Sequence, residues 1–316
     1  MKTCLVTGGK GFIGSHLINF LKDKGHYVRC VDVKPTSILQ TMEDEFLCGD
    51  LRKLSVAYSA LQGIDWVFNL AANMGGIGYI TELNAPIMRD NALINLNMAE
   101  AARLCDTQRI FFSSSACAYN RNLQESPDCE GLKESDAVPA HPDSAYGWEK
   151  LFSEFMYQSF QHDYGLKIRI ARFHNIYGAH CIFSGGQEKA PAALCRKVIM
   201  GKEAMEIWGD GEQTRSFLYV SDCLDAVYRL MQSNFDEPVN IGTSELISIN
   251  DLALLIQEIA GKKLLLRHNP DMPQGVRGRN ADISRSWKVL GWKPTVSLEA
   301  GMKKLYDWIF SQLPLM

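Results

Sequence analysis

The chain has 316 residues, of which 46% are hydrophobic and 22% charged, and its formal net charge is -3. That balance is typical of a globular protein with a large core, in one domain or two interleaved ones, and excludes a general nucleic-acid binder, which needs a basic surface. Nine cysteines are dispersed without metal-ligand or disulfide spacing, so we expect no metal site and a reducing compartment. The lack of a long apolar run and the immediate first strand predict no membrane span, no signal peptide and a cytoplasmic location.

Predicted strands and helices alternate through the first half of the chain. A short strand at 3–7 precedes a glycine turn, a helix at 15–24 and a second strand at 27–33, an order that opens a dinucleotide-binding βαβ unit. The later elements are a strand near 46–47, a strand at 66–70, a helix at 87–103, a strand at 110–114, a helix at about 145–164 and a strand at 168–173. This alternation predicts an α/β fold of Rossmann type, a doubly wound parallel sheet covered by helices on both faces.

The regular alternation stops after Asn175. Glycines and prolines interrupt the following segment, and its strands and helices become shorter, as in a small capping lobe. The segments 217–220 and 239–241 are candidates to return to the main sheet. We therefore expect an NAD-binding Rossmann domain over 1–175 plus about 216–242, and a smaller α/β substrate-binding lobe over about 176–215 and 243–316.

A cofactor site is predicted by Gly8, Gly11 and Gly14, which form a G-x-x-G-x-x-G turn between a strand and a helix. Such a turn lets the backbone approach a pyrophosphate at the helix N-terminus, where free N–H groups favour anions. Asp32, at the end of the second strand, should accept hydrogen bonds from the adenosine ribose and repel a 2′-phosphate, which favours NAD over NADP. Asp50 is expected at the adenine edge. The expected cofactor residues are Gly8, Gly11, Phe12, Ile13, Gly14, Asp32, Asp50, Leu51, Tyr146 and Lys150.

The predicted catalytic groups lie on one helix and on the strand end before it. Tyr146 and Lys150 are four residues apart and share a helix face. A lysine ammonium beside a phenol lowers the phenol's pKa, so we expect Tyr146 to take a proton from a sugar hydroxyl while a hydride leaves the same carbon. Ser115 could hold the reacting oxygen. Cys117 adds a second ionisable group that hydride transfer alone does not need.

These motifs carry a resemblance to known enzymes. The glycine turn together with Tyr146-x-x-x-Lys150 resembles the extended short-chain dehydrogenase/reductase superfamily, whose members act mostly on nucleotide sugars. Within it, the segments 69–76, 114–117, 186–193, 195–197, 208–217 and 275–280 resemble the GDP-mannose 3,5-epimerase family. The similarity runs from the first strand to about residue 308. It implies NAD as the cofactor, GDP-mannose as the substrate and a homodimer in which the helices at 87–103 and 145–164 pair.

The expected reaction inverts two sugar carbons. Oxidation of a sugar carbon to a ketone acidifies the hydrogens on both neighbouring carbons, so inversion there needs an acid/base group on each face of the ring. Cys117 and Lys189 are suitable types, and the resemblance implies that they form this pair. Which of them is the base at each carbon stays open. The resemblance further implies that Tyr146 moves the C4 hydroxyl proton while NAD+ takes and later returns the C4 hydride, converting GDP-D-mannose into GDP-L-galactose.

The resemblance also implies a set of substrate contacts. Lys197, Arg215 and Arg279 match phosphate ligands, because a diphosphate needs cations or N–H donors. Asn175 and Gln213 match polar contacts. The complete expected set is Gly75, Ser115, Asn175, Glu188, Lys189, Ala190, Lys197, Gln213, Arg215 and Arg279.

Several alternatives stay open from the sequence. A 4,6-dehydratase would usually place Asp-Glu where this chain has Ala116-Cys117, and a simple 4-epimerase would not need Lys189. A non-catalytic NAD-binding regulator would tend to lose the Tyr or the Lys of the motif, and both are present. Arg277 could be a second phosphate ligand or a surface ion pair, and His174 could line the pocket or serve only the structure.

Overall fold

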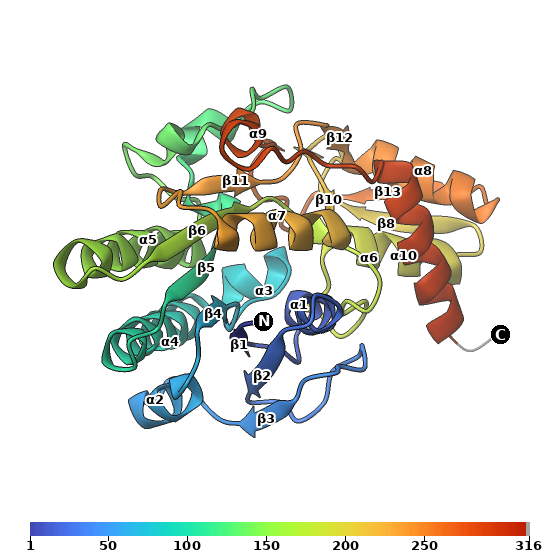
Figure 1. The fold of residues 1–316 in the computed structure, drawn as a ribbon. Helices are drawn as coiled ribbons and strands as arrows, with labels where there is room; N and C mark the ends of the chain where they lie inside the picture. Colours follow the sequence, from blue (N-terminus) through green and yellow to red (C-terminus); the bar gives the residue numbers. More distant parts are fainter. Residues whose placement is uncertain (314–316) are drawn as a thin grey trace.

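The computed structural model describes residues 1–313, and its centre is a seven-stranded parallel sheet in the order β11-β6-β5-β4-β1-β2-β3 (Figure 1). The strands are β1 (Thr3–Thr7), β2 (Tyr27–Asp32), β3 (Glu45–Cys48), β4 (Trp66–Asn69), β5 (Arg109–Ser115), β6 (Ile168–Phe173) and β11 (Val239–Ile241). The chain runs outward from β1 through β2 to β3, then returns and continues on the other side through β4. The predicted doubly wound fold is therefore confirmed, with its switch point between β1 and β4, where ligands bind in such sheets.

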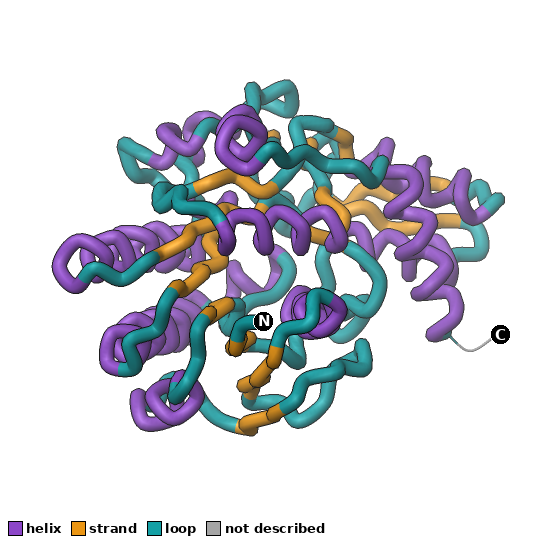
Figure 2. The backbone as a smooth tube through the Cα atoms, in the orientation of Figure 1, coloured by secondary structure: helices purple, strands orange, loops and turns teal. Residues whose placement is uncertain are grey.

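Helices cover both faces of this sheet (Figures 1 and 2). One face packs against α1 (Phe12–Asp23) and α7 (Val220–Gln232), with α9 (Ser284–Leu290) beside β11. The other face packs against α2 (Leu54–Leu61), α4 (Asn84–Leu104) and α5 (Ala145–Tyr164). Successive strand residues serve opposite cores, as in β1, where Cys4 and Val6 face α1 while Leu5 faces α2 and α4. Both strand faces are apolar because both are buried.

Short elements connect the sheet to a second lobe. The connecting pieces are α3 (Ile77–Glu82), the 3₁₀ helices at Ala116–Ala118, Arg121–Gln124 and Glu134–Ala137, β7 (Ile176–Tyr177) and β10 (Leu218–Tyr219). The lobe contains α6 (Ala190–Met200), β8 (Ala204–Trp208), β9 (Thr214–Arg215), β12 (Ile247–Ser248), α8 (Ile249–Ala260), β13 (Leu265–Asn269), β14 (Gly278–Arg279) and α10 (Leu298–Gln312). Its helices enclose an apolar core of their own around Cys195, Leu252 and Leu305. This separate core supports the two-lobe division, whose residue boundaries stay a prediction.

The structure differs from the expected elements at a few places. The segment 239–241 joins the main sheet as β11, but 217–220 does not, because β11 already occupies the edge beside β6 and β10 pairs with β7 instead. The first helix begins at Phe12, so its opening turn lies inside the glycine motif. The helices α2 and α3, and the helices α6 to α10 of the second half, were not among the expected elements.

No helix within residues 1–313 combines the length and the apolar character that a membrane crossing requires.

Candidate functional site

A cleft of about 1000 Å³ follows the carboxyl ends of the strands and continues to α6 and β8 of the lobe. Every residue expected at the site borders it, although the role of each stays a prediction. The lining includes Gly8, Gly11, Phe12, Ile13, Gly14, Asp32, Asp50, Leu51, Gly75, Ser115, Cys117, Tyr146, Lys150, Asn175, Glu188, Lys189, Ala190, Lys197, Gln213, Arg215 and Arg279. The fold thus gathers side chains from the whole length of the chain into one cavity.

The glycine turn forms one end of this cleft. Gly8 has a φ of +65°, and a Cβ on Gly14 would lie 2.3 Å from the Gly8 carbonyl oxygen, so a side chain at position 14 would push α1 away from the turn. No side chain caps the start of α1, and helix geometry leaves the N–H groups of its first turn, at Phe12 and Ile13, without helical partners. These free donors and the positive helix end fit a pyrophosphate.

Two acidic side chains continue the cleft at the ends of β2 and β3. Asp32 accepts the backbone N–H groups of Lys10 and Lys34, each at 2.9 Å, which fixes its carboxylate at the cleft wall. Asp50 is paired with Arg52, whose Nη2 lies 2.8 Å from Oδ2, and hydrogen bonds from Arg52 lower the pKa of Asp50. Arg52 therefore already occupies part of the Asp50 carboxylate, while Asp32 keeps a position suited to a ribose.

Tyr146 and Lys150 lie on the first two turns of α5. The Ser144 hydroxyl caps this helix by accepting the N–H of Gly147 at 3.2 Å. Only 6% of Tyr146 and 1% of Lys150 are exposed. The Lys150 Nζ donates to the Ser113 carbonyl at 2.9 Å and lies 5.5 Å from the centre of the Tyr146 ring. The predicted pair is thus in place, joined to the end of β5.

The expected lowering of the Tyr146 pKa is wrong for this structure. Burial raises the pKa of the phenol, and the charges of Cys117 and Glu149 raise it further, whereas the neighbouring Ser115 hydroxyl lowers it. Lys150 does not offset the burial, because its ammonium is itself buried and hydrogen-bonded to Ser113, and burial lowers the pKa of Lys150 as well.

Cys117 has a buried cationic neighbour that the sequence did not suggest. Its N–H donates to the Ser115 hydroxyl at 3.2 Å, which starts the 3₁₀ helix after β5. The Nη1 of Arg279 donates to the Cys117 sulfur at 3.2 Å, and Nη2 donates to Asp143 at 2.8 Å. The Nε of Arg279 donates to Gln124. Arg279, expected at the phosphates, is thus held against the thiol, 162 residues apart in sequence.

Lys189 faces Cys117 from the lobe. It is the N-cap residue of α6, and its side chain has no hydrogen-bond or ion-pair partner within residues 1–313. Burial lowers the pKa of Lys189, and the nearby Cys117 partly opposes that shift. The preceding Glu188 is occupied differently, since it pairs with Arg196 at 2.9 Å. The structure therefore places a free amine and a thiol on one cavity.

Arg215 is a partly buried basic group in the cleft that has no acidic partner in the described part of the chain. Arg215 donates only to backbone carbonyls, of Thr214 at 2.7 Å and Gln274 at 3.1 Å. Burial, together with the charge of Arg279, lowers the pKa of Arg215 to about 10. A buried guanidinium of this kind is costly unless an anion pairs with it.

The remaining polar candidates are oriented by the lobe backbone. Asn175 donates to the Ser216 carbonyl at 2.9 Å, and Gln213 donates to the Trp208 carbonyl at 3.0 Å. Among the described residues the buried Gln213 Oε1 has no partner, so it can still accept a hydrogen bond. The Lys197 Nζ donates to the Glu206 carbonyl at 2.9 Å. Across residues 1–313, no three His, Cys, Asp or Glu side chains are grouped to hold a metal ion.

A family model matches most of the sheet-forming part of the chain. Residues 4–242 match the NAD dependent epimerase/dehydratase family. The chain belongs to this family. Membership in the NAD dependent epimerase/dehydratase family confirms the expected superfamily and NAD as the cofactor.

Individual proteins and solved structures also resemble this chain. GDP-mannose 3,5-epimerase of Arabidopsis thaliana is 45% identical over 310 residues, which cover 98% of this chain and 82% of that protein. GDP-mannose 3,5-epimerase 1 of Oryza sativa subsp. japonica is 44% identical over the same shares. Among solved structures, UDP-glucose 4-epimerase of Thermotoga maritima with UDP-glucose has a TM-score of 0.89 at 29% identity, covering 98% of this chain and 99% of its own. The resemblance to GDP-mannose 3,5-epimerases is thus confirmed.

The two open residues both serve the structure. Arg277 pairs with Asp210 on the surface, with Nη1 to carboxylate distances of 2.9 and 3.0 Å. His174 is fully buried away from the cleft, and its Nε2 lies 2.9 Å from the Asn240 Oδ1. Burial lowers the pKa of His174 to about 3.

Buried His174 predicts a loss of stability in mild acid. Between about pH 6.5 and pH 3 the unfolded chain binds a proton at this histidine that the folded chain does not, so the free energy of unfolding falls as pH falls. From pH 7 to pH 5 this single group should remove about 2 kcal/mol. We expect His174→Gln to lose correspondingly less stability over that range in urea unfolding, whereas exposed His162→Gln should behave as the parent. Identical pH profiles for His174→Gln and the parent would contradict this assignment.

Proposed function

We propose that this protein is an isomerase that converts GDP-D-mannose into GDP-L-galactose through a transient 4-keto sugar. One observation carries the proposal, namely that the thiol of Cys117 and the amine of Lys189 border the same cleft as Tyr146 and the glycine turn. A 4-epimerase needs only the tyrosine end of this cleft. Inversion beside a ketone needs two additional proton-transfer groups. The similarity to GDP-mannose 3,5-epimerases supports the same substrate.

The first step generates the ketone at C4. Bound NAD+, held at the glycine turn, would supply the hydride acceptor for this step. Tyr146 takes the C4 hydroxyl proton, and Ser115, whose hydroxyl adjoins the phenol, positions the C4 oxygen. Lys150 anchors α5 to the Ser113 carbonyl, which fixes the Tyr146 ring in the cleft. At the end of the reaction Tyr146 returns the proton to the C4 oxygen, and the hydride held by bound NAD+ would return to C4, so no external reductant would be needed.

The ketone then makes the C3 and C5 hydrogens acidic. The Arg279 Nη1 donates to the Cys117 sulfur at 3.2 Å, which holds the sulfur in place, and a thiolate is the form of a cysteine that removes a proton. Burial favours the neutral amine of Lys189, which can also remove a proton, and each group in its protonated form can deliver one. The pair can therefore work on opposite faces of the ring, with either residue as the base at a given carbon.

The substrate's diphosphate would complete the charge balance of the cleft. Partly buried Arg215 has only carbonyl partners within residues 1–313, so a phosphate oxygen would supply its missing anion. Lys197 borders the same region of the cleft and could neutralise the second phosphate. Arg279, held by Asp143 and Gln124, serves the thiol in this proposal.

The deciding assay incubates the purified chain with NAD+ and GDP-mannose in heavy water. We expect deuterium at C3 and C5 with inversion at both carbons and no loss of water, because each inversion exchanges a carbon-bound proton. Mass spectrometry and NMR of the nucleotide sugar report both. A product lighter by one water would instead identify a dehydratase, inversion at C4 without carbon-bound deuterium a 4-epimerase, and unchanged sugar would reject the proposal.

Two variants separate the steps of this mechanism. Cys117→Ala should lower deuterium uptake by about 100-fold or more. The absorbance of the reduced cofactor should still rise transiently, since C4 oxidation does not use the thiol. Tyr146→Phe should abolish both signals, because the ketone never forms. Exposed Cys48→Ala is the matched control and should retain both. Full deuterium uptake by Cys117→Ala would remove the thiol from the mechanism.

We further propose a homodimer formed through α4 and α5. These neighbouring helices leave large apolar side chains exposed in the single chain, on α4 at Leu93 and Leu96 and on α5 at Trp148, Phe152 and Phe155. The α5 residues follow helical spacing and form one face, and Phe155 is 72% exposed. A second copy of the same surface would bury this face in an isologous contact.

A charge in the centre of this face should break the dimer. Phe155→Glu is expected to weaken self-association by about 100-fold, because a carboxylate cannot be buried unpaired in an apolar interface. Light scattering coupled to size exclusion measures the mass. Phe310→Glu, on the exposed side of α10, is the control and should stay dimeric. A parent protein that elutes as a monomer at all concentrations would refute the interface.

We also propose that the protein is cytoplasmic. All nine cysteines are free, and five of them are buried. Free thiols fit a reducing compartment.

A further inference from the structure

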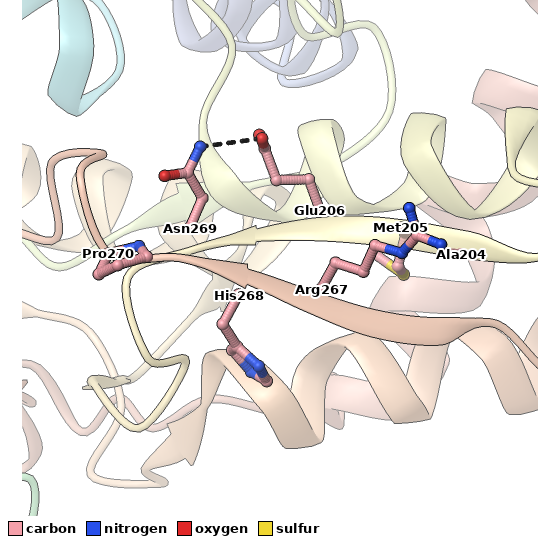
Figure 3. A pocket seen from close by; sticks show the side chains of 7 residues that line it. All are labelled: Ala204, Met205, Glu206, Arg267, His268, Asn269 and Pro270. Carbon is pink, nitrogen blue, oxygen red and sulfur yellow. Dashed lines mark hydrogen bonds between the residues drawn. The ribbon is translucent and has the colours of Figure 1, made fainter.

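The outer end of the cleft carries a carboxylate that the proposed mechanism does not use. Glu206 and Trp208 lie on β8 and border the cleft beside Lys197. The indole Nε1 of Trp208 donates to Glu206 Oε1 at 2.9 Å, and the Asn269 Nδ2 donates to Oε2 at 3.1 Å. In Figure 3, Glu206 and Asn269 project to the same side of the β8 and β13 ribbons, while His268 points to the other side. Both oxygens of the carboxylate are therefore held in a fixed orientation.

The carboxylate of Glu206 is ionised and available. Hydrogen bonds from Asn269 and Trp208 lower its pKa, so it is a pure acceptor at neutral pH. Its side chain is 48% exposed, and the Lys197 Nζ forms an ion pair with Oε1 at 3.6 Å. Each oxygen has accepted one hydrogen bond and retains a lone pair for a ligand.

We propose, on the basis of the function proposed above, that Glu206 recognises the guanine base of the substrate. Guanine presents two adjacent donors on one edge, N1–H and the 2-amino group, and a carboxylate with two oriented oxygens matches them. Uracil presents a single N–H between two carbonyl oxygens, which a carboxylate repels. Adenine has no ring N–H on the corresponding edge. Glu206 would therefore select guanosine diphosphate sugars and reject other bases.

The neighbours of Glu206 fit this position for a base. Lys197, a proposed phosphate ligand, donates to the Glu206 carbonyl at 2.9 Å and lies 5.7 Å from the Trp208 ring centre. A diphosphate held by Lys197 thus leaves its nucleoside next to β8. The Trp208 ring, whose tilt is fixed by the bond from Nε1 to Glu206, offers an aromatic face for stacking, which binds any base. Selection among bases then falls to the carboxylate.

The test compares GDP-mannose with IDP-mannose, which lacks only the 2-amino group. The parent protein should prefer GDP-mannose by about 10-fold or more in kcat/KM, because the absent amine leaves one carboxylate oxygen unpaired. Glu206→Gln keeps the shape of the side chain but should lower kcat/KM for GDP-mannose by about 30-fold, mainly through KM, and reduce the GDP/IDP preference to near unity. Calorimetric titration with GDP and IDP should show the same pattern. Exposed Glu203→Gln, just before β8, is the matched control and should behave as the parent.

The outcomes separate this inference from the proposed function. If the parent epimerises GDP-mannose and Glu206→Gln, folded by circular dichroism, keeps the parental GDP/IDP preference, Glu206 does not recognise guanine although the function stands. If the parent leaves GDP-mannose unchanged and binds GDP no better than UDP, the function and the recognition both fail. If Glu206→Gln retains its kcat but loses the GDP/IDP preference, and Glu203→Gln keeps that preference, the inference is supported.

Discussion

The geometry of the cleft depends on one close contact between the start of α5 and the end of β5. A Cβ on Gly147 would lie 2.1 Å from the Cys117 carbonyl oxygen, so only glycine lets the helix come this near. On the next turn Lys150 donates to the Ser113 carbonyl from a fully desolvated position. Ser115 and Tyr146 lie between these two contacts. Any side chain at position 147 would separate the phenol from the serine and cysteine with which it is proposed to act.

The opposite wall of the cleft comes from a different part of the chain. Lys189 starts α6 in the lobe, and the loop before it meets the sheet domain where the Gly76 N–H donates to the Gln187 carbonyl at 3.1 Å. A Cβ on Gly76 would lie 2.3 Å from the Glu188 carbonyl oxygen, so this junction too requires glycine. Two glycines thus set how near the amine stands to the thiol. The chemistry proposed for the pair needs both to reach one sugar ring.

Local patterns predicted most strands and two long helices of the first 173 residues, but not the amphipathic helices α7 and α8, and other features depend on long-range contacts. The limits of α5 and β6 match the expected segments, and the glycine turn lies where its spacing placed it. By contrast, Arg279 meets Cys117 only because β14 is drawn beside β9, a pairing without a sequence signal. The pKa of Tyr146 could not be judged from its spacing to Lys150, because burial, which the sequence does not show, outweighs the ammonium. Glu206 was not predicted as a site residue, because a single acidic residue on a short strand has no distinctive sequence pattern.

The helix α5 presents one side to the cleft and the opposite side to the surface. Tyr146 and Lys150 face inward, whereas Trp148, Phe152 and Phe155 face outward from the same turns of α5. Backbone hydrogen bonds join these turns of α5, so contacts on the aromatic side also help to position the phenol. Packing against a neighbour would thus brace the reactive group from behind. Surface residues of α5 that contact neither sugar nor nucleotide would then affect turnover, because they would fix the position of the helix that carries Tyr146.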